Sequence, residues 1–144
     1  AGMTVWTASP EVSAKATGTV RSILSTLGDE LHVEDEKLID MATALSASGP
    51  AYVFLFIEAL VDAGVYLGMP RSVAHQLAVQ TVAGSARLVQ ESGLHPTELK
   101  DMVTSPGGTT AEALRTFEQG GFTGIVIDAV TAAYEKSKAL GVPQ

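Results

Sequence analysis

The stretch that decides the fold runs Ala51-Tyr-Val-Phe-Leu-Phe-Ile-Glu-Ala-Leu-Val-Asp-Ala-Gly-Val-Tyr-Leu67. Apolar side chains occupy nearly every position, and only Glu58 and Asp62, four residues apart, mark a polar edge. Four-residue spacing places these two carboxylates on the same face of an α-helix. A helix that is apolar almost all round must be covered on several sides. In a chain of 144 residues, we therefore expect a second subunit to pack against this helix.

Breaks on both sides of this helix divide the rest of the chain. Ser46-Ala-Ser-Gly-Pro50 precedes it, and the proline disfavours helical geometry at Gly49. Gly68-Met-Pro70 follows it. Apolar residues recur at helical spacing elsewhere, which predicts helices near 12–27, 34–45, 71–92, 95–103, 109–119 and 122–140. Residues 3–8 and 31–33 have the pattern of short extended segments, and Gly28 fits a helix C-cap. The sequence predicts an all-α bundle of about six to seven helices.

The composition limits the kinds of partner. Hydrophobic residues make up 46% of the chain and charged residues only 17%, against about 25% charged in an average soluble domain. The formal net charge of −7 argues against nucleic acid and against an anionic membrane surface as partners. The lack of cysteine excludes disulfides and thiolate nucleophiles, and it fits a cytoplasmic location. The longest unbroken apolar run, residues 51–57, is shorter than the roughly 20 residues that span a membrane.

The stretch that carries chemistry is Asp101-Met-Val-Thr-Ser-Pro-Gly-Gly-Thr-Thr-Ala-Glu-Ala-Leu114. Gly107 and Gly108 let the backbone come close to another group, and the helix that follows offers free N–H groups to an anion. The loop holds no Lys or Arg, so a small carboxylate suits it better than a polyphosphate. Thr109 and Glu112 fit the capping-box pattern. A tight connection without a ligand is the alternative interpretation.

Other candidate sites are weaker. The stretch 46–50 either lines a pocket or forms only a kink between two helices. The three histidines do not have metal-ligand spacing, so no metal site is predicted. Glu58 and Asp62 are either a paired acid and base or the solvated edge of a buried helix. The sequence contains no G-x-G-x-x-G motif and no P-loop, so the chain does not hold a dinucleotide by itself in the Rossmann manner.

Several stretches resemble, in order, the C-terminal domain of pyrroline-5-carboxylate reductases. They are Ala44-Leu-Ser-Ala-Ser-Gly-Pro-Ala-Tyr52, Gly68-Met-Pro70, His95-Pro96, Leu99-Lys-Asp-Met-Val-Thr-Ser-Pro-Gly-Gly-Thr-Thr-Ala-Glu-Ala-Leu114 and Gly120-Gly-Phe122. Ala47 departs from the family, in which glycine is frequent, and Thr109 stands where a smaller residue is common. The resemblance implies that residues 1–10 are the end of a Rossmann domain or a linker. Residues 11–144 would then be the helical dimerisation and substrate-binding domain of a fragment.

The resemblance also implies an activity and an assembly. Members of the family reduce 1-pyrroline-5-carboxylate to L-proline, the last step of proline biosynthesis, with NADPH or NADH bound mainly by the N-terminal domain. A chain without that domain is expected to be inactive. The family's C-terminal helices interleave with those of a second subunit, so the expected assembly is a homodimer, and some members build decamers from such dimers.

The same resemblance assigns roles to individual residues. The expected substrate-binding residues share the glycine turn and the helix start after it: Ser105, Gly107, Gly108, Thr109 and Thr110. Thr110 matches the family's site threonine, whose hydroxyl is placed to hydrogen-bond the ring nitrogen, and it is the expected catalytic residue. Ser48, Gly49 and Pro50 are expected to lie near the nicotinamide of the cofactor.

Two other classes of protein remain open from the sequence. One is a non-catalytic helical module that only oligomerises. The other is the helical domain of a different NAD(P)-dependent reductase, which acts on a small hydroxy or keto acid. Such enzymes usually place a catalytic lysine on a helix, whereas the lysines here fall on faces expected to meet solvent.

Overall fold

The computed structural model describes residues 2–141 and separates the chain into two compact units. The first holds the residues up to Pro50 together with those from Ile127 onward, and the second holds Ala51–Val126. Helices dominate both units, and the strands found among residues 2–141 are one short pair near the N-terminus. The predicted all-α class, with a few extended residues at the front, is therefore confirmed.

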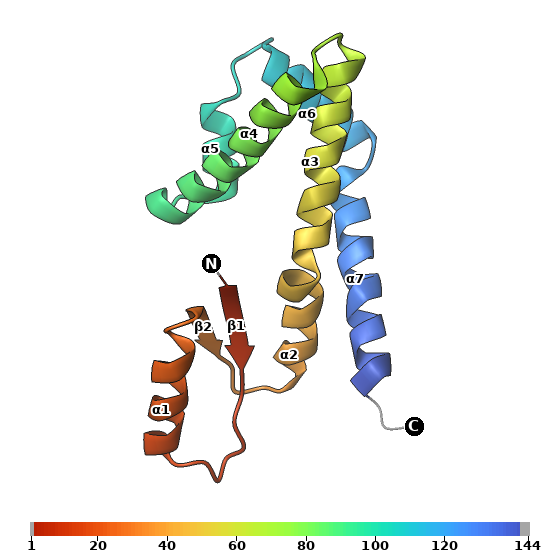
Figure 1. Cartoon of the computed structure of the whole chain (residues 1–144). Coiled ribbons are helices and arrows are strands. Elements are labelled where there is room, and N and C mark those ends of the chain that lie inside the picture. Colours follow the sequence, from red (N-terminus) through yellow and green to blue (C-terminus); the bar gives the residue numbers. More distant parts are fainter. Residues whose placement is uncertain (1, 142–144) are drawn as a thin grey trace. The chain divides into compact units, whose positions relative to one another are not determined.

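A parallel β-α-β segment opens the first unit. It consists of β1 (Gly2–Trp6), α1 (Ala14–Leu24) and β2 (Gly28–His32), with the strands in register from Gly2↔Gly28 to Trp6↔His32 (Figure 1). The extended segment predicted at 31–33 thus begins earlier and pairs with β1.

Gly28 does not cap α1, contrary to the prediction. The C-cap is Ser25, and Gly28 instead begins β2 with a φ of 151°. A Cβ there would collide with the carbonyl oxygen of Gly2 on the paired strand and would lie 2.9 Å from its nitrogen. The close approach of two backbones, rather than helix capping, requires glycine at this position.

The helical stretch after β2 is nearly continuous. It contains α2 (Lys37–Ala42), the π-helical turn η1 (Thr43–Ala47) and the start of α3 (Gly49–Tyr66). The amide of Ser48 donates to the carbonyl of Thr43 at 2.9 Å, which is the five-residue step of a π-turn. The predicted interruption at 46–50 is therefore a widened helical turn rather than a loop.

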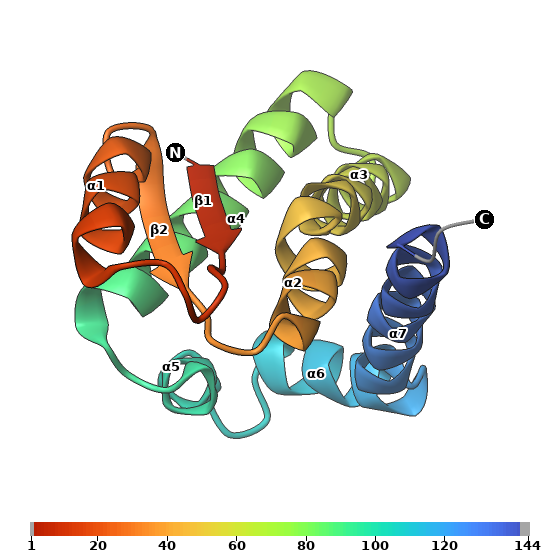
Figure 2. The same ribbon diagram turned by 90° about the horizontal axis from the view of Figure 1, so that it is seen from below.

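Residues 127–141 of α7 (Phe122–Gly141) complete the first unit. Figure 2 shows α1 on one side of the two strands and α2 on the other. The Ser137 hydroxyl on α7 donates to the Asp40 carboxylate on α2 at 2.6 Å. A side-chain hydrogen bond thus joins two helices that are 97 residues apart in the sequence.

The second unit contains the rest of α3, α4 (Arg71–Ser92), α5 (Pro96–Met102), α6 (Thr109–Gln119) and the first turns of α7. Its small core lies between α3 and α4, where Val61, Ala74 and Ala78 are buried. A Cβ on Gly64 would lie 2.9 Å from that of Ala74, so the lack of a side chain at position 64 lets the two helices approach closely there. The short α5 and α6 follow α4 and carry the glycine turn between them.

Helix α3 keeps most of its apolar surface exposed within the chain. Phe54 and Leu55 are 67% and 68% exposed, and Tyr66 is 91% exposed. The helical stretch Lys37–Tyr66 contains an 18-residue window with a mean hydropathy of 1.6, of which 11% is buried, and it is long and apolar enough to cross a membrane by length and composition alone. The core helix of a soluble protein passes the same test. The exposed apolar faces therefore require cover that the described residues do not provide.

Candidate carboxylate-binding site

A tight turn, Ser105–Gly108, connects α5 to α6. The amide of Gly108 donates to the carbonyl of Ser105 at 3.0 Å. Pro106 occupies the second position of the turn, and Gly107 occupies the third with a φ of 67°. Proline followed by a residue with positive φ is the pattern of a type II turn, which is why glycine is needed at position 107.

The side chain of Ser105 folds over Gly108. A Cβ on Gly108 would collide with Ser105 Oγ and would lie 3.1 Å from the carbonyl oxygen of Ser105. The hydroxyl therefore occupies space that any other residue at position 108 would fill. This arrangement places one hydroxyl donor beside the N-terminus of α6.

Helix α6 begins without a side-chain cap. Gly108 is the N-cap residue, and the first intrahelical bond runs from the amide of Glu112 to the carbonyl of Gly108 at 3.3 Å. The predicted capping box is therefore wrong, because Thr109 is already the first helical residue. The amides of residues 109–111 precede this first bond, and such amides at the positive end of the helix dipole form a site suited to an anion.

The one acidic side chain in the first turn of α6 is paired. Arg115 Nε lies 3.1 Å from both carboxylate oxygens of Glu112, and Arg115 Nη2 also donates to Glu112. The hydrogen bond from Arg115 lowers the pKa of the Glu112 carboxyl, and the pKa of Arg115 rises in return. Because the guanidinium offsets the carboxylate, Glu112 repels an incoming anion less than an unpaired glutamate would.

The turn is open rather than covered by its own unit. Ser105, Gly107 and Thr109 are exposed, whereas Gly108 and Thr110 are half-buried. The five residues predicted to bind substrate thus lie in one continuous segment of turn and helix start. The arrangement offers backbone amides and the hydroxyls of Ser105 and Thr110 to a small acid, with no cationic side chain in the turn itself.

The second predicted group, Ser48, Gly49 and Pro50, lies in the first unit, at the junction of η1 and α3. A hollow of about 460 Å³ adjoins this junction. Its lining includes Pro50 but neither Ser48 nor Gly49.

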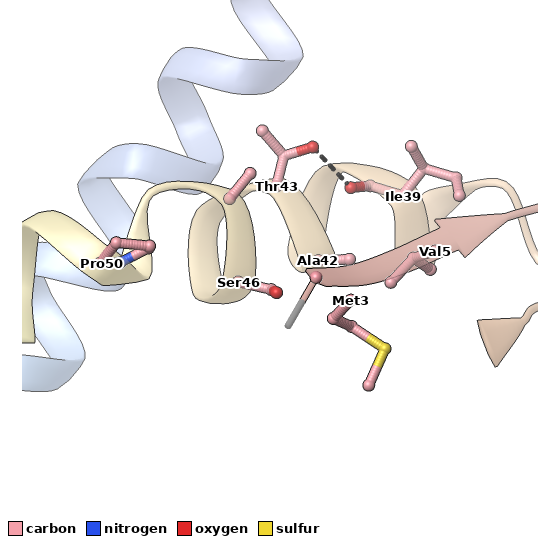
Figure 3. Close-up of a pocket in the computed structure, with 9 residues that line it drawn as sticks. Met3, Val5, Ile39, Ala42, Thr43, Ser46 and Pro50 are labelled. Carbon is pink, nitrogen blue, oxygen red and sulfur yellow. Dashed lines mark hydrogen bonds between the residues drawn. The ribbon is translucent and has the colours of Figure 1, made fainter. Parts of the chain in front are cut away.

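Figure 3 shows the walls of this hollow, which β1, α2 and η1 contribute. Met3 and Val5 come from β1, and Thr43 and Ser46 from the π-turn. Sequence reasoning missed Met3, Val5 and Thr43, whereas Ser46 belongs to the stretch 46–50, for which a pocket lining was one of the two interpretations. The alternating pattern of residues 3–8 indicated a short strand. The sequence does not show which helix the Met3 and Val5 side of that strand meets.

The remaining candidates do not form a site. Within the described part of the chain, no three metal-ligating side chains gather. Asp62 forms an ion pair with Arg71 at 2.9 Å, with both side chains more than half exposed. This pairing favours the solvated-edge interpretation of Glu58 and Asp62 over that of a paired acid and base.

Long helices with exposed apolar faces define a helical association domain, and its open glycine turn leads into a helix start that has no side-chain cap. Residues 36–140 match the family model for pyrroline-5-carboxylate reductase dimerisation. The chain belongs to the pyrroline-5-carboxylate reductase family.

Individual relatives agree with this assignment. The chain is 47% identical to the pyrroline-5-carboxylate reductase of Synechocystis sp. over 98% of its length, and 49% identical to that of Escherichia coli over 97%. The structure of the Coxiella burnetii reductase is similar, with a TM-score of 0.92, 38% identity and 98% of this chain covered. A pyrroline carboxylate reductase of Plasmodium falciparum with NADP bound gives a TM-score of 0.87 at 41% identity over 96% of this chain. The chain spans 52% of the length of each of these four relatives.

Proposed function

We propose that this chain is the C-terminal part of an NAD(P)H-dependent reductase that converts 1-pyrroline-5-carboxylate to L-proline. The observation that carries the proposal is the open Ser105–Gly108 turn at the uncapped start of α6 in a member of this family. Since the chain matches only about half of each relative, we infer that the activity needs a nucleotide-binding domain as well. The chain alone would be inactive.

The carboxylate of the substrate would bind at the N-terminus of α6. Its oxygens would accept hydrogen bonds from the amides of residues 109–111 and from the Ser105 hydroxyl. Such charge-assisted bonds to an anion are roughly twice as strong as bonds between neutral groups. The absence of a cation in the turn keeps the site selective for a single small carboxylate over a polyphosphate.

Thr110 would orient the imine ring. It is half-buried in the first turn of α6, one residue beyond the exposed Thr109. Its hydroxyl would hydrogen-bond the ring nitrogen and relay a proton between that nitrogen and solvent, because an unassisted hydroxyl is a poor general acid. A nicotinamide cofactor, when bound, would supply the hydride for the imine carbon, while the protonated ring nitrogen held by Thr110 would take up the electron pair of the C=N bond.

The nicotinamide cofactor would meet this chain at the junction of η1 and α3. Ser48, Gly49 and Pro50 lie there, and the walls of the hollow beside them include apolar side chains such as Met3 and Val5 together with Thr43 and Ser46. A hollow of about 460 Å³ with mainly apolar walls suits the face of a flat ring. The phosphates would be held by another domain, since this sequence has no dinucleotide fingerprint.

The division of the chain into domains remains a proposal. The sequence suggested a boundary after residue 10, with 11–144 as the helical domain. The β-α-β segment extends to His32 and the family match begins at residue 36, which supports a boundary between these two points. Residues 2–32 would then belong to the sheet of the nucleotide-binding domain.

The assembly would be a homodimer, and decamers built from dimers would be a further state. The exposed apolar residues of α3 support it, because Phe54, Leu55 and Tyr66 need cover that a second copy would provide. A location in the cytoplasm belongs to the same proposal, and the lack of cysteine is consistent with a reducing compartment.

Replacing Thr110 in the full-length reductase tests the proposal. For Thr110→Val, which keeps the shape and removes the hydroxyl, we expect kcat to fall about 10- to 100-fold, the value of a lost hydrogen bond to a charged group. Thr116→Val is the matched control, since its hydroxyl donates only to the Glu112 carbonyl of the same helix at 3.0 Å. Unchanged turnover in the Thr110 variant with intact folding would remove Thr110 from the mechanism.

A helical module that only oligomerises is the alternative, which the exposed apolar helices also favour. Titrating the chain with L-proline while following the amide signals of Gly107 and Gly108 separates the two functions. We expect saturable shifts confined to the turn and the start of α6. An absence of shifts at high proline concentration would favour the oligomerisation module.

A further inference from the structure

The side-chain bond between Asp40 and Ser137 joins two helices at one point. The Ser137 hydroxyl on α7 donates to Asp40 Oδ1 at 2.6 Å, and both residues are half-buried. Figures 1 and 2 both show α2 beside the C-terminal part of α7. Asp40 also acts on the next residue of α7, since its negative charge contributes, after Glu135 and Tyr134, to raising the pKa of Lys138.

Helix α2 leads directly into the π-turn. It has six residues and forms one nearly continuous helical stretch with η1 and α3, so a shift of α2 along its axis would reach the turn. The π-turn that follows is a rare geometry, in which one extra residue widens the helix. Ala44, the second residue of η1, is only 1% exposed, so the turn is anchored by packing as well as by its own backbone bonds.

Packing contacts alone do not fix the register of α2 along the axis of α7. The half-buried residues of α7 in this unit recur three or four apart and form one stripe: Val130, Ala133, Tyr134 and Ser137. Apolar contacts are not directional, and a small side chain such as Ala133 on this stripe provides little interlocking. A hydrogen bond has a narrow range of length and angle, so the Asp40–Ser137 bond fixes the register that packing leaves loose.

The register of α2 decides the shape of the hollow beside η1. Asp40 lies three residues before Thr43, where the π-turn begins, and Ile39 and Ala42 of α2 line the hollow together with Ser46 of the turn. A shift of α2 along its axis would therefore move this wall of the hollow relative to Met3 and Val5 on β1.

We propose that Asp40 and Ser137 are positioning residues, whose hydrogen bond sets the register of α2 on α7 and so holds the π-turn in the shape that the nicotinamide end of the cofactor requires. The cofactor part of this inference rests on the proposed reductase function. The register part does not, because it concerns only the geometry of the first unit. Neither residue touches the hollow itself.

Hydrogen exchange tests the register part in the full-length protein. Ser137→Ala removes the donor with little change in volume, and Ser137→Thr retains a hydroxyl. In Ser137→Ala we expect the amides of residues 44–48 to exchange about tenfold faster or more, the effect of losing a hydrogen bond to a charged group. Ser22→Ala is the matched control, because its hydroxyl donates only to the Gly18 carbonyl of its own helix at 3.0 Å. Unchanged exchange at 44–48 in Ser137→Ala would overturn the inference, whatever the activity.

Steady-state kinetics tests the cofactor part. At a temperature well below unfolding, we expect the KM for the nicotinamide cofactor to rise about tenfold in Ser137→Ala. The KM for the imine should stay within a factor of two, and Ser137→Thr should restore the cofactor KM. A merely structural bond would lower the unfolding temperature without this split between the two KM values, and that result would overturn the cofactor part. If the wild-type protein were inactive as a reductase while Ser137→Ala still exchanged faster at 44–48, only the proposed function would be contradicted.

Discussion

Gly108 leaves room for the hydroxyl of Ser105 at the start of α6. A Cβ on residue 108 would collide with Ser105 Oγ, although its φ of −81° suits any residue. The hydroxyl can turn away at small cost, because it lies at the end of a side chain, but it then no longer faces the anion site. The expected effect of a substitution here is therefore on binding more than on folding.

Gly108→Ala in the full-length reductase should raise the KM for the imine about tenfold, the value of one hydrogen bond to a charged group. The free energy of unfolding should change by no more than about 1 kcal/mol. Steady-state kinetics and urea unfolding measure the two quantities. Gly84→Ala is the control, because Gly84 lies inside a helix and a Cβ at this position meets nothing within 4 Å.

A double variant isolates the contact. In a Ser105→Ala background the hydroxyl is already absent, so adding Gly108→Ala should raise the KM much less than it does in the wild type. Equal effects in both backgrounds would mean that Ser105 has no part in binding the carboxylate.

The pairing of Glu112 with Arg115 predicts how the stability of the fold depends on pH. Because Arg115 lowers the pKa of Glu112 in the folded chain, this carboxylate stabilises the fold above the pKa it has when unfolded. That contribution disappears as the pH falls through the lower, folded value. The unfolding temperature of Glu112→Gln should therefore lie slightly below that of the wild type at neutral pH and approach it in acid. The difference is expected to be small, since the pair is exposed. A gap that widened in acid would contradict this sign.

Sequence patterns located the residues of the turn but misjudged one role. Pro106, Gly107 and Gly108 were enough to predict a turn followed by a helix. The pattern of Thr109 and Glu112 suggested a capping box, yet Gly108 is the N-cap residue, and the Glu112 side chain accepts hydrogen bonds from Arg115 instead. A threonine before a helix and a threonine in its first position have the same sequence signature, so the pattern alone does not separate them.

Helix α5 precedes the Ser105–Gly108 turn, and its N-cap helps to hold it in place. His95 is its N-cap, and His95 Nδ1 accepts from the amide of Thr97 at 3.2 Å, with Pro96 at the next position. The helix has only seven residues and leads directly into the segment that holds Ser105. Loss of its cap should loosen the approach to the site.

His95→Ala should lower the free energy of unfolding by about 1 kcal/mol, the usual cost of an N-cap that is lost. His95→Asn retains an acceptor and should recover most of this loss. Chemical denaturation measures the difference, with His75→Ala as the control because His75 lies inside α4 and is not a cap residue. If His95→Asn were as unstable as His95→Ala, the cap would not explain the role of His95.

Helix boundaries were the most predictable part of the fold. The limits 71–92 and 109–119 agree with the structure, since proline and glycine mark them. The π-turn was not predictable, because the same residues fit a four-residue or a five-residue step. The pairing of β1 with β2 and the Asp40–Ser137 bond were missed because both depend on segments far apart in the sequence.

For the whole molecule, the exposed apolar surface is the main unsatisfied feature. Core residues are few: among the described hydrophobic residues only Val33, Ala44, Val61, Ala74 and Ala78 are buried. The nearly all-apolar stretch 51–67 predicted that this helix is covered by a second subunit. The structure agrees to the extent that α3 exposes large apolar side chains within the chain.

We expect the chain itself to form dimers at micromolar concentration, measured by light scattering. Leu55→Glu, at a position that is 68% exposed within the chain, should produce monomers, because an unpaired charge would be buried at the interface. Gln90→Glu adds the same charge at an exposed polar position of α4 and should leave the dimer intact. A stable, well-folded monomer of the unchanged chain would contradict the expectation.

The single tryptophan of the sequence lies in the β-α-β segment. Its ring packs 4.4 Å from that of His32, and its Nε1 donates to Glu30 at 2.7 Å, while Arg21 of α1 holds Glu30 at 3.1 Å. Indole fluorescence therefore reports on this one segment, whereas far-ultraviolet ellipticity reports mainly on the helices. The molecule thus carries its own optical probe, and heating curves recorded by the two signals will diverge if the strands melt apart from the helical remainder.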